Sequence, residues 1–382
     1  MGKGIYTYYK ERLIEISGNN KCLYLKKIQA KGAYDIGRIF EGRDDKALQL
    51  VDFLFSKNKK RTLTLLNESE AEDIAKGLSD SPRGSALGKK QLIEVEIAKI
   101  KELKREIEDI EKETGRYELF IGYPFVFGSI NSGSSKMLIK APLLLFPVKI
   151  DITGENTAQL SLSDSESIQL NRALIFAYAQ AKKLSIEDVE LEFEDLSEFD
   201  SLSDIIAKLA EAKIEIDSVP SRHLYNFERF KEPSHKDELS VRYAAVLGRF
   251  PISNSIYSDY SMLEKQNLRN DAIDELIRQG GRKSAKRIQL LEKEKLKARA
   301  KAAKKQKKTG LVRSYAVKLP DYSQSEVVSQ VDKRGNMVIW GPPGTGKSQT
   351  IVNVISDAIA KNKRVLVVSQ KKAALDVVYS RL

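Results

Sequence analysis

Residues 336–348 read Asn-Met-Val-Ile-Trp-Gly-Pro-Pro-Gly-Thr-Gly-Lys-Ser, and this stretch decides how the C-terminal part of the chain folds. Its apolar start is typical of a buried strand, and apolar side chains recur at helical spacing after Lys347. The loop between them matches the pattern G-x-x-x-x-G-K-[ST], in which glycines let backbone N–H groups surround a phosphate. A glycine turn without a ligand is the alternative, but the flanking strand, the helix and the Lys-Ser pair favour a P-loop.

This P-loop predicts a site for ATP and Mg²⁺ in which the side chains have defined roles. Lys347 is expected to bring a positive charge to the β- and γ-phosphates, and the Ser348 hydroxyl is expected to bind Mg²⁺. These two are the expected catalytic residues, and Ser348 is the expected metal ligand. The loop residues expected to bind the nucleotide are Gly341, Pro342, Pro343, Gly344, Thr345, Gly346, Lys347, Ser348 and Gln349.

Beyond the loop, the pattern predicts a helix at 347–360, a buried strand at 364–368 and a second helix at 373–382. Together with the strand at 336–340, this order is βαβα, which opens a parallel α/β sheet. Residues 311–382 are therefore predicted to be the first part of a P-loop domain of the α/β class.

The preceding residues, 1–262, are predicted to form a separate α+β region. Isoleucine and leucine recur on one face of residues 89–113 while Lys and Glu fill the other faces, which is typical of a stalk-like helix. Short apolar runs at 117–152 predict a small β subdomain with a turn at 131–134. Further strands are expected at 22–25, 62–66 and 241–250, and further helices at 5–16, 171–183 and 202–212.

A basic segment joins the two regions. Residues 282–308 hold 13 Lys and Arg but only two acidic residues, so they account for nearly all of the net charge of +12. We expect a helical connector at 263–310, because Lys and Ala are helix formers and few apolar residues follow Leu296. Such a segment can bind a polyanion or can be a solvated linker, and the sequence leaves both open.

Composition points to a cytoplasmic protein without a membrane segment. The single cysteine, Cys22, cannot form an internal disulfide, and the apolar runs are far too short to span a bilayer. No apolar run of a signal peptide is present at the N-terminus. His223 and His235 are isolated from other metal-binding residue types, so a separate metal site is not expected.

The C-terminal motifs resemble those of superfamily 1 helicases, with the nonsense-mediated-decay helicase as the nearest kind. The resemblance rests on Tyr322-Ser-Gln-Ser325, on Met337-Val-Ile-Trp340 with the adjoining P-loop, and on Arg364-Val-Leu-Val-Val-Ser-Gln-Lys-Lys-Ala-Ala-Leu-Asp376. It implies a RecA-like domain in which Gln324 reads the adenine. It also implies a turn that contacts the backbone of single-stranded DNA or RNA through Ser369, Gln370, Lys371 and Lys372.

The N-terminal region resembles an uncharacterised domain that large bacterial helicase-like proteins carry ahead of the motor. The segments that carry this resemblance are 9–20, 141–148, 163–174 and 243–260. No function follows from it.

The sequence departs from the helicase pattern beyond the P-loop and the turn. It ends at Leu382 without an Asp-Glu pair of a Walker B motif, without the later Lys, Arg and Gln motifs, and without a second RecA-like domain. We therefore expect the remaining motor domains in the same or a second polypeptide.

The leading interpretation is the ATP-binding front part of a helicase or translocase, an ATP hydrolase when intact. One alternative is a nucleotide-dependent module that binds nucleic acid or a partner without hydrolysing ATP. Another is an AAA+ ATPase, which shares Gly-Pro-Pro-Gly-Thr-Gly-Lys.

Overall fold

The computed structural model describes residues 20–28, 32–58, 60–67, 89–132, 135–163, 167–184, 196, 199, 201–233, 236–250, 262, 315–331 and 337–382. The chain divides into an N-terminal unit, Met1–Lys112 with Arg116–Met262, and a C-terminal unit, Leu263–Leu382 with Glu113–Gly115. The expected helix at 5–16 and the expected basic connector at 263–310 lie outside the described residues. No helix among the described residues is both long and apolar enough to cross a bilayer.

The N-terminal unit is built on a long antiparallel hairpin. Strand β3 (Phe120–Ser132) pairs with β4 (Ser135–Ile152) from Phe120 opposite Pro147 to Ser132 opposite Ser135. The described strands form one eight-stranded sheet in the order β1-β8-β3-β4-β5-β2, with β6 also on β4 and β7 also on β3. The other strands are β1 (Ala33–Asp35), β2 (Thr62–Leu66), β5 (Ala158–Leu162), β6 (Gln169–Leu170), β7 (Leu239–Arg242) and β8 (Val246–Gly248).

Residues 117–152, predicted as a small β subdomain, contain the central hairpin of this larger sheet. All pairings between the named strands are antiparallel. Strand β8 lies between β1 and β3, so the far end of the unit's sequence is inserted beside its beginning. Gly128 allows β7 to approach β3, because a Cβ there would lie 1.8 Å from the carbonyl oxygen of Glu238.

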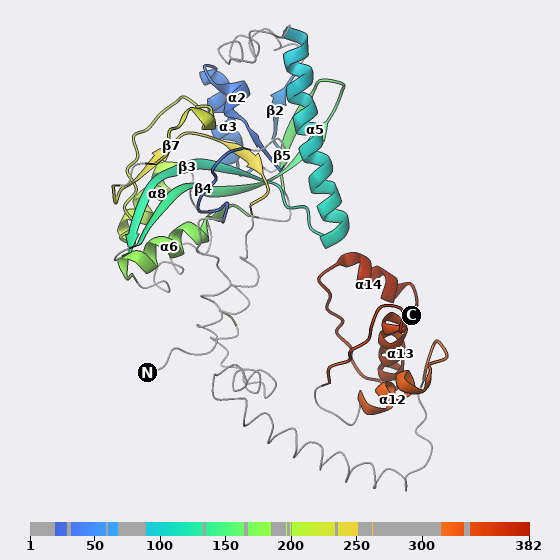
Figure 1. Ribbon diagram of the computed structural model, residues 1–382. Coiled ribbons are helices and arrows are strands. Elements are labelled where there is room, and N and C mark those ends of the chain that lie inside the picture. Colours follow the sequence, from blue (N-terminus) through green and yellow to red (C-terminus); the bar gives the residue numbers. More distant parts are fainter. Residues whose placement is uncertain are drawn as a thin grey trace. The chain divides into compact units, whose positions relative to one another are not determined.

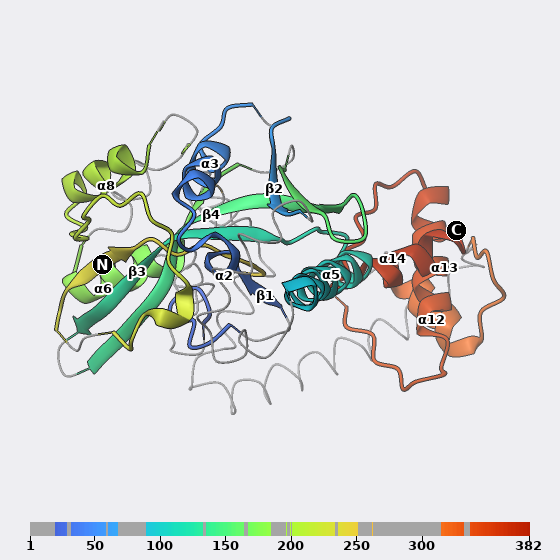
Figure 2. The ribbon, with the colours of Figure 1, turned by 90° about the horizontal axis from the view of Figure 1, so that it is seen from above.

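Helices cover the sheet at both ends. Helix α6 (Arg172–Lys182) and the long helix α5 (Lys89–Thr114) lie at opposite ends of the sheet in both views (Figures 1 and 2). The predicted apolar stripe of α5 is buried, since Ile93, Ile97, Ile100, Leu103 and Ile107 are each at most 3% exposed. Among the described residues of this unit, the other helices are α2 (Gly37–Phe40), α3 (Asp44–Leu54), α8 (Leu202–Glu211) and the 3₁₀ turn η4 (Phe227–Arg229).

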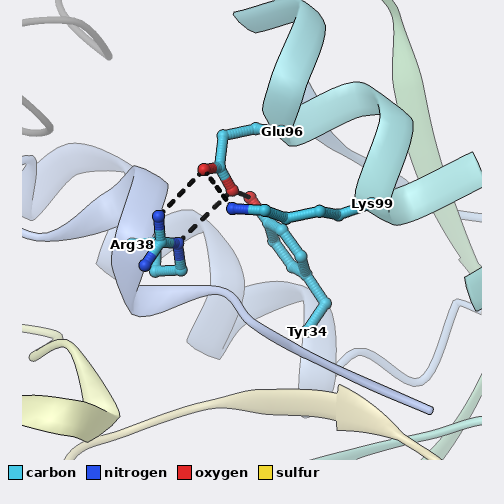
Figure 3. A network of polar contacts seen from close by, with 4 residues as sticks. All are labelled: Tyr34, Arg38, Glu96 and Lys99. Atoms are coloured by element: carbon cyan, nitrogen blue, oxygen red, sulfur yellow. Dashed lines mark hydrogen bonds and ion pairs between the residues drawn. The ribbon is translucent and has the colours of Figure 1, made fainter. Parts of the chain in front are cut away.

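A buried carboxylate joins α5 to β1 and α2. Glu96 accepts hydrogen bonds from the Tyr34 hydroxyl at 3.0 Å, from Arg38 Nη2 at 3.0 Å and from Lys99 Nζ at 2.7 Å (Figure 3). Burial raises the pKa of Glu96, but the bonds from Arg38 and Lys99 outweigh it, so the pKa lies below its usual value. The carboxylate therefore stays charged and fixes the rotation of α5 about its axis.

Two further polar side chains tie distant segments of the unit together. Asp35 accepts from the backbone N–H of Gly37 at 2.9 Å and from that of Phe227 at 2.8 Å. Asn171 caps α6 and also donates to the carbonyl oxygens of Cys22 and Pro142, each at 2.6 Å. Because each side chain satisfies backbone groups in the core, neither has a simple apolar replacement.

The C-terminal unit contains α12 (Tyr322–Val331), α13 (Lys347–Ala360) and α14 (Lys372–Tyr379). The helices predicted at 347–360 and 373–382 are confirmed as α13 and α14, although α14 ends at Tyr379, before Leu382. The strands predicted at 336–340 and 364–368 are not formed, because no backbone ladder joins their described residues to a neighbour. Their apolar side chains are accordingly exposed, Trp340 by 91% and Leu366 by 87%.

Candidate nucleotide-binding site

The P-loop is shaped by glycines that other residues could not replace without strain. Gly344 and Gly346 have φ angles of 84° and 78°, in the left-handed region that favours glycine. A Cβ on Gly346 would also lie 2.5 Å from the Gln324 side-chain nitrogen. Because Gly346 is the N-cap of α13, the loop leads directly to the helix end whose free N–H groups favour anions. This cradle fits a phosphate group.

Side chains of the loop fold back onto its own carbonyl groups. The Thr345 hydroxyl donates to the carbonyl oxygen of Pro342 at 2.9 Å. The Lys347 ammonium donates to the carbonyl oxygens of Gly341 and Pro342 at 2.6 and 3.1 Å. The charge is thus held at the loop, where a phosphate bound by the loop amides would meet it.

Gln324, which the resemblance implies as the adenine-reading residue, lies against the P-loop. Asp321 fixes it at the start of α12, because the Gln324 backbone N–H donates to the Asp321 carboxylate at 2.7 Å. The Gln324 side-chain nitrogen donates to the carbonyl oxygen of Thr345 at 3.3 Å. A side chain able to hydrogen-bond a base therefore lies against the loop able to hold the phosphates.

The other predicted nucleotide ligands lie on or next to the same loop. Pro343 is exposed in it, and Ser348 is in the first turn of α13, partly exposed and adjacent to Lys347. This position suits a hydroxyl ligand for a divalent metal ion beside a phosphate. Gln349 is engaged elsewhere, because its side-chain nitrogen donates to the carbonyl oxygen of Leu319 at 2.7 Å.

Sequence reasoning missed two polar residues farther along α13. Asn353 and Asp357 are 0% and 3% exposed, and both bond backbone groups of residues 315–318. The available signal was the spacing of four from Gln349 to Asn353 and from Asn353 to Asp357, which places all three on one face of a helix whose other residues are largely apolar.

The predicted nucleic-acid turn is exposed. Ser369, Gln370, Lys371 and Lys372 all lie at the surface before and at the start of α14. The Lys372 ammonium pairs with Asp376 at 2.9 Å, and because both side chains are exposed this pair contributes little free energy. A polyanion could therefore compete for Lys372.

Metal-binding residue types are dispersed in the part of the chain that the structure describes. Its His, Cys, Asp and Glu residues form no group of three or more that could hold a metal ion. His223 pairs instead with Asp44, through its Nδ1 atom. His235 lies outside the described residues.

Two family models match separate parts of the chain. A model described as an AAA domain matches residues 319–382, and one described as a protein of unknown function (DUF4011) matches residues 12–176. The first match contains the P-loop and Gln324, and the second contains the β3–β4 hairpin. No solved structure matches the chain significantly.

Curated relatives are named as helicases. The chain is 28% identical to the uncharacterized ATP-dependent helicase MG140 of Mycoplasma genitalium over 345 aligned residues. These residues make up 87% of this chain and 27% of that protein. The chain is 26% identical over 275 residues to the homolog in Mycoplasma pneumoniae, covering 71% and 22%. Over 45 residues it is 44% identical to the DNA polymerase alpha-associated DNA helicase A of Schizosaccharomyces pombe, covering 12% and 7%. The chain thus spans about a quarter of the length of the Mycoplasma relatives.

Proposed function

We propose that this helicase-like protein with an N-terminal DUF4011 domain is the ATP-binding front part of a superfamily 1 helicase or translocase. The observation that carries the proposal is the 3.3 Å bond from Gln324 to the carbonyl oxygen of Thr345. It joins a base-reading side chain to a phosphate-binding loop, and a generic phosphate site would need only the loop.

The proposed roles follow from the chemistry of each group. The loop amides and Lys347 would hold the β- and γ-phosphates, and Ser348 would hold Mg²⁺. When bound, Mg²⁺ neutralises charge on the phosphate oxygens. Gln324, with both a donor and an acceptor, would recognise the adenine edge. The contribution of these residues is positioning and charge stabilisation.

We further propose that residues 311–382 belong to a RecA-like domain with a parallel sheet. The support is the exposed apolar surface of residues 337–340 and 364–368, which would be buried if these segments became strands beside other strands. Those strands would come from the remaining motor domains, in the same or a second polypeptide. Residues 263–310 would be the basic connector to the N-terminal domain, 1–262.

The proposed partner is single-stranded DNA or RNA in the cytoplasm. The exposed turn with Lys371 and Lys372 would contact phosphates of the strand, as such turns do in the helicases that this chain resembles. The basic segment 282–308 would add attraction for a polyanion that does not depend on base sequence. No membrane association is proposed.

The Lys347→Ala variant tests the ATP site. Loss of one charge-assisted contact costs about 1.5–3 kcal/mol, so Mg·ATP should bind about 10- to 150-fold more weakly. Isothermal titration calorimetry on the full chain measures this. The matched control is Lys363→Ala, which removes an exposed lysine beyond the end of α13 and should leave the affinity unchanged. Equal affinity for wild type and Lys347→Ala would refute the assignment of this loop as the ATP site.

A further inference from the structure

We propose that Gln349, Asn353 and Asp357 form a positioning stripe on α13 that sets Gln324 against the P-loop and thereby determines selectivity for the base. The inference rests on the proposed function, because it assumes that Gln324 reads the adenine. The three stripe residues would act on the nucleotide only through the chain segment 315–319, which precedes Gln324 by five residues.

The stripe holds this segment through side chain to backbone bonds. Asp357 accepts from the N–H of Tyr315 at 3.0 Å, and Gln349 donates to the carbonyl oxygen of Leu319 at 2.7 Å. Asn353 lies between them and bonds both backbone groups of Lys318, accepting at 3.1 Å and donating at 2.9 Å. Because the three residues are spaced by four, they follow one face of α13 while the segment runs along it.

The paired bonds of Asn353 fix the register of the segment. A side-chain amide that bonds both N–H and C=O of one residue takes the place of a neighbouring strand, with one donor and one acceptor in matched positions. A shift of the segment by one residue would break both bonds. Since Asn353 is fully buried, its side-chain amide would be left unpaired away from water, and the shift is disfavoured.

Fixing Leu319 fixes Gln324, because the chain between them has little freedom. Pro320 limits the backbone, and Asp321 accepts from the Gln324 N–H at 2.7 Å. Helix α12 then packs on α13, with Val328 and Val352 buried. The P-loop is the N-terminal extension of α13. One helix therefore carries the phosphate-binding loop at its end and sets the position of the base-reading side chain from its face.

Base selectivity separates this role from a merely structural one. Calorimetry on the full chain would compare Mg·ATP with magnesium tripolyphosphate, which presents phosphates without a base. We expect the ratio of the two affinities to fall about 3- to 10-fold in Gln324→Ala and in Asn353→Ala, as for loss of one hydrogen bond. Tripolyphosphate should bind with unchanged affinity. The double variant should lose no more selectivity than Gln324→Ala alone, because both changes remove the same contact.

Two further variants keep the test decisive. Ser356→Ala is the control on the same helix, because its hydroxyl bonds only the α13 carbonyl of Val352 among the interactions described, and the ratio should not change. If Asn353→Ala fails to fold, Gln349→Met decides, because this side chain is partly exposed and its loss should lower the ratio in the same direction. Equal weakening of both ligands in the stripe variants, or full additivity in the double variant, would overturn the inference.

Amide hydrogen exchange distinguishes failure of the inference from failure of the proposed function. If Gln324→Ala leaves the ratio unchanged, its adenine role is wrong. The stripe is then judged by the exchange of the Gln324 amide, which should be at least about tenfold faster in Asn353→Ala if the stripe positions this residue. Unchanged protection of that amide in a folded Asn353→Ala protein would exclude positioning by the stripe, whatever the nucleotide results.

Discussion

Removing the Glu96 carboxylate should strongly destabilise the N-terminal unit. Tyr34 is 2% exposed, and the Glu96→Ala variant leaves its hydroxyl without a hydrogen-bond acceptor. The same variant leaves Arg38 without its buried ion-pair partner. Breaking a buried ion pair from one side costs about 3–5 kcal/mol. The Arg38 and Lys99 side chains are 27% and 31% exposed, so water recovers part of this cost. The unpaired hydroxyl adds about 1–3 kcal/mol, and we expect a total of about 3–5 kcal/mol.

Urea unfolding followed by far-ultraviolet circular dichroism measures this loss, which is a large fraction of the roughly 5–15 kcal/mol that stabilises an ordinary domain. The midpoint should fall while the slope with urea stays constant. The Glu108→Ala variant is the matched control on the same helix. Its partner Lys104 lies 3.7 Å away and both side chains are partly exposed, so it should cost less than about 1 kcal/mol.

The same network predicts how stability depends on pH. Because the pKa of Glu96 is lowered in the folded protein, its contribution is complete above the pKa of the unfolded carboxyl group and is lost as the pH falls through the folded value. The Glu96→Gln variant should therefore lose less stability on acidification than the wild type. Equal midpoints for Glu96→Ala and Glu108→Ala, or identical acid sensitivity of wild type and Glu96→Gln, would show that the network does not stabilise the unit.

Four further outcomes are expected. The pure 382-residue chain should bind ATP but release phosphate very slowly, because no Walker B acid pair follows its P-loop; rapid turnover stimulated by nucleic acid would contradict this. Changing Lys371 and Lys372 to Gln should weaken binding of labelled single strands of every base sequence alike. Changing the five lysines of segment 301–308 to Gln should flatten the salt dependence of that binding, whereas an unchanged slope would make the segment a linker. The double change Ile97→Asp and Ile107→Asp places two carboxylates in the core and should lower the free energy of unfolding by roughly several kcal/mol. An unchanged melting temperature would contradict the packing of α5.

Periodicity predicted the long elements because their packing is regular. The stripe of α5 faces one buried surface, and β3 and β4 are buried on both faces, so a helical stripe and continuous apolar runs were enough to find them. The P-loop was recognisable because its glycines and its Lys-Ser pair serve one local function. Helix α13 was predicted to its observed bounds for the same reason, since a loop of this kind must be followed by a helix.

The remaining features depend on partners that no local pattern identifies. Residues 364–368 have the composition of a strand, yet a strand forms only where another backbone supplies hydrogen bonds, and no described segment does so. Asn353 was not recognised because a polar residue on a helix is usually solvated, and only the structure shows that segment 315–319 covers it. Gln324 was found by resemblance, whereas its bond to Thr345 required the fold.

The position of β8 between β1 and β3 determines when the N-terminal unit can fold during synthesis. Strand β1 is synthesised early, and among the described strands it pairs only with β8. Strand β8 is synthesised more than 200 residues later. The hydrogen bond from the N–H of Phe227 to the Asp35 carboxylate likewise cannot form before Phe227 has been synthesised. The long chain segment between two such partners must close into a loop before the contact between them can stabilise the unit, and this slows folding. A polypeptide truncated at residue 176, where the DUF4011 match ends, would lack β7 and β8. It would expose the unpaired edges of β1 and β3 and should aggregate, so the cooperative folding unit extends beyond the boundary of that sequence family.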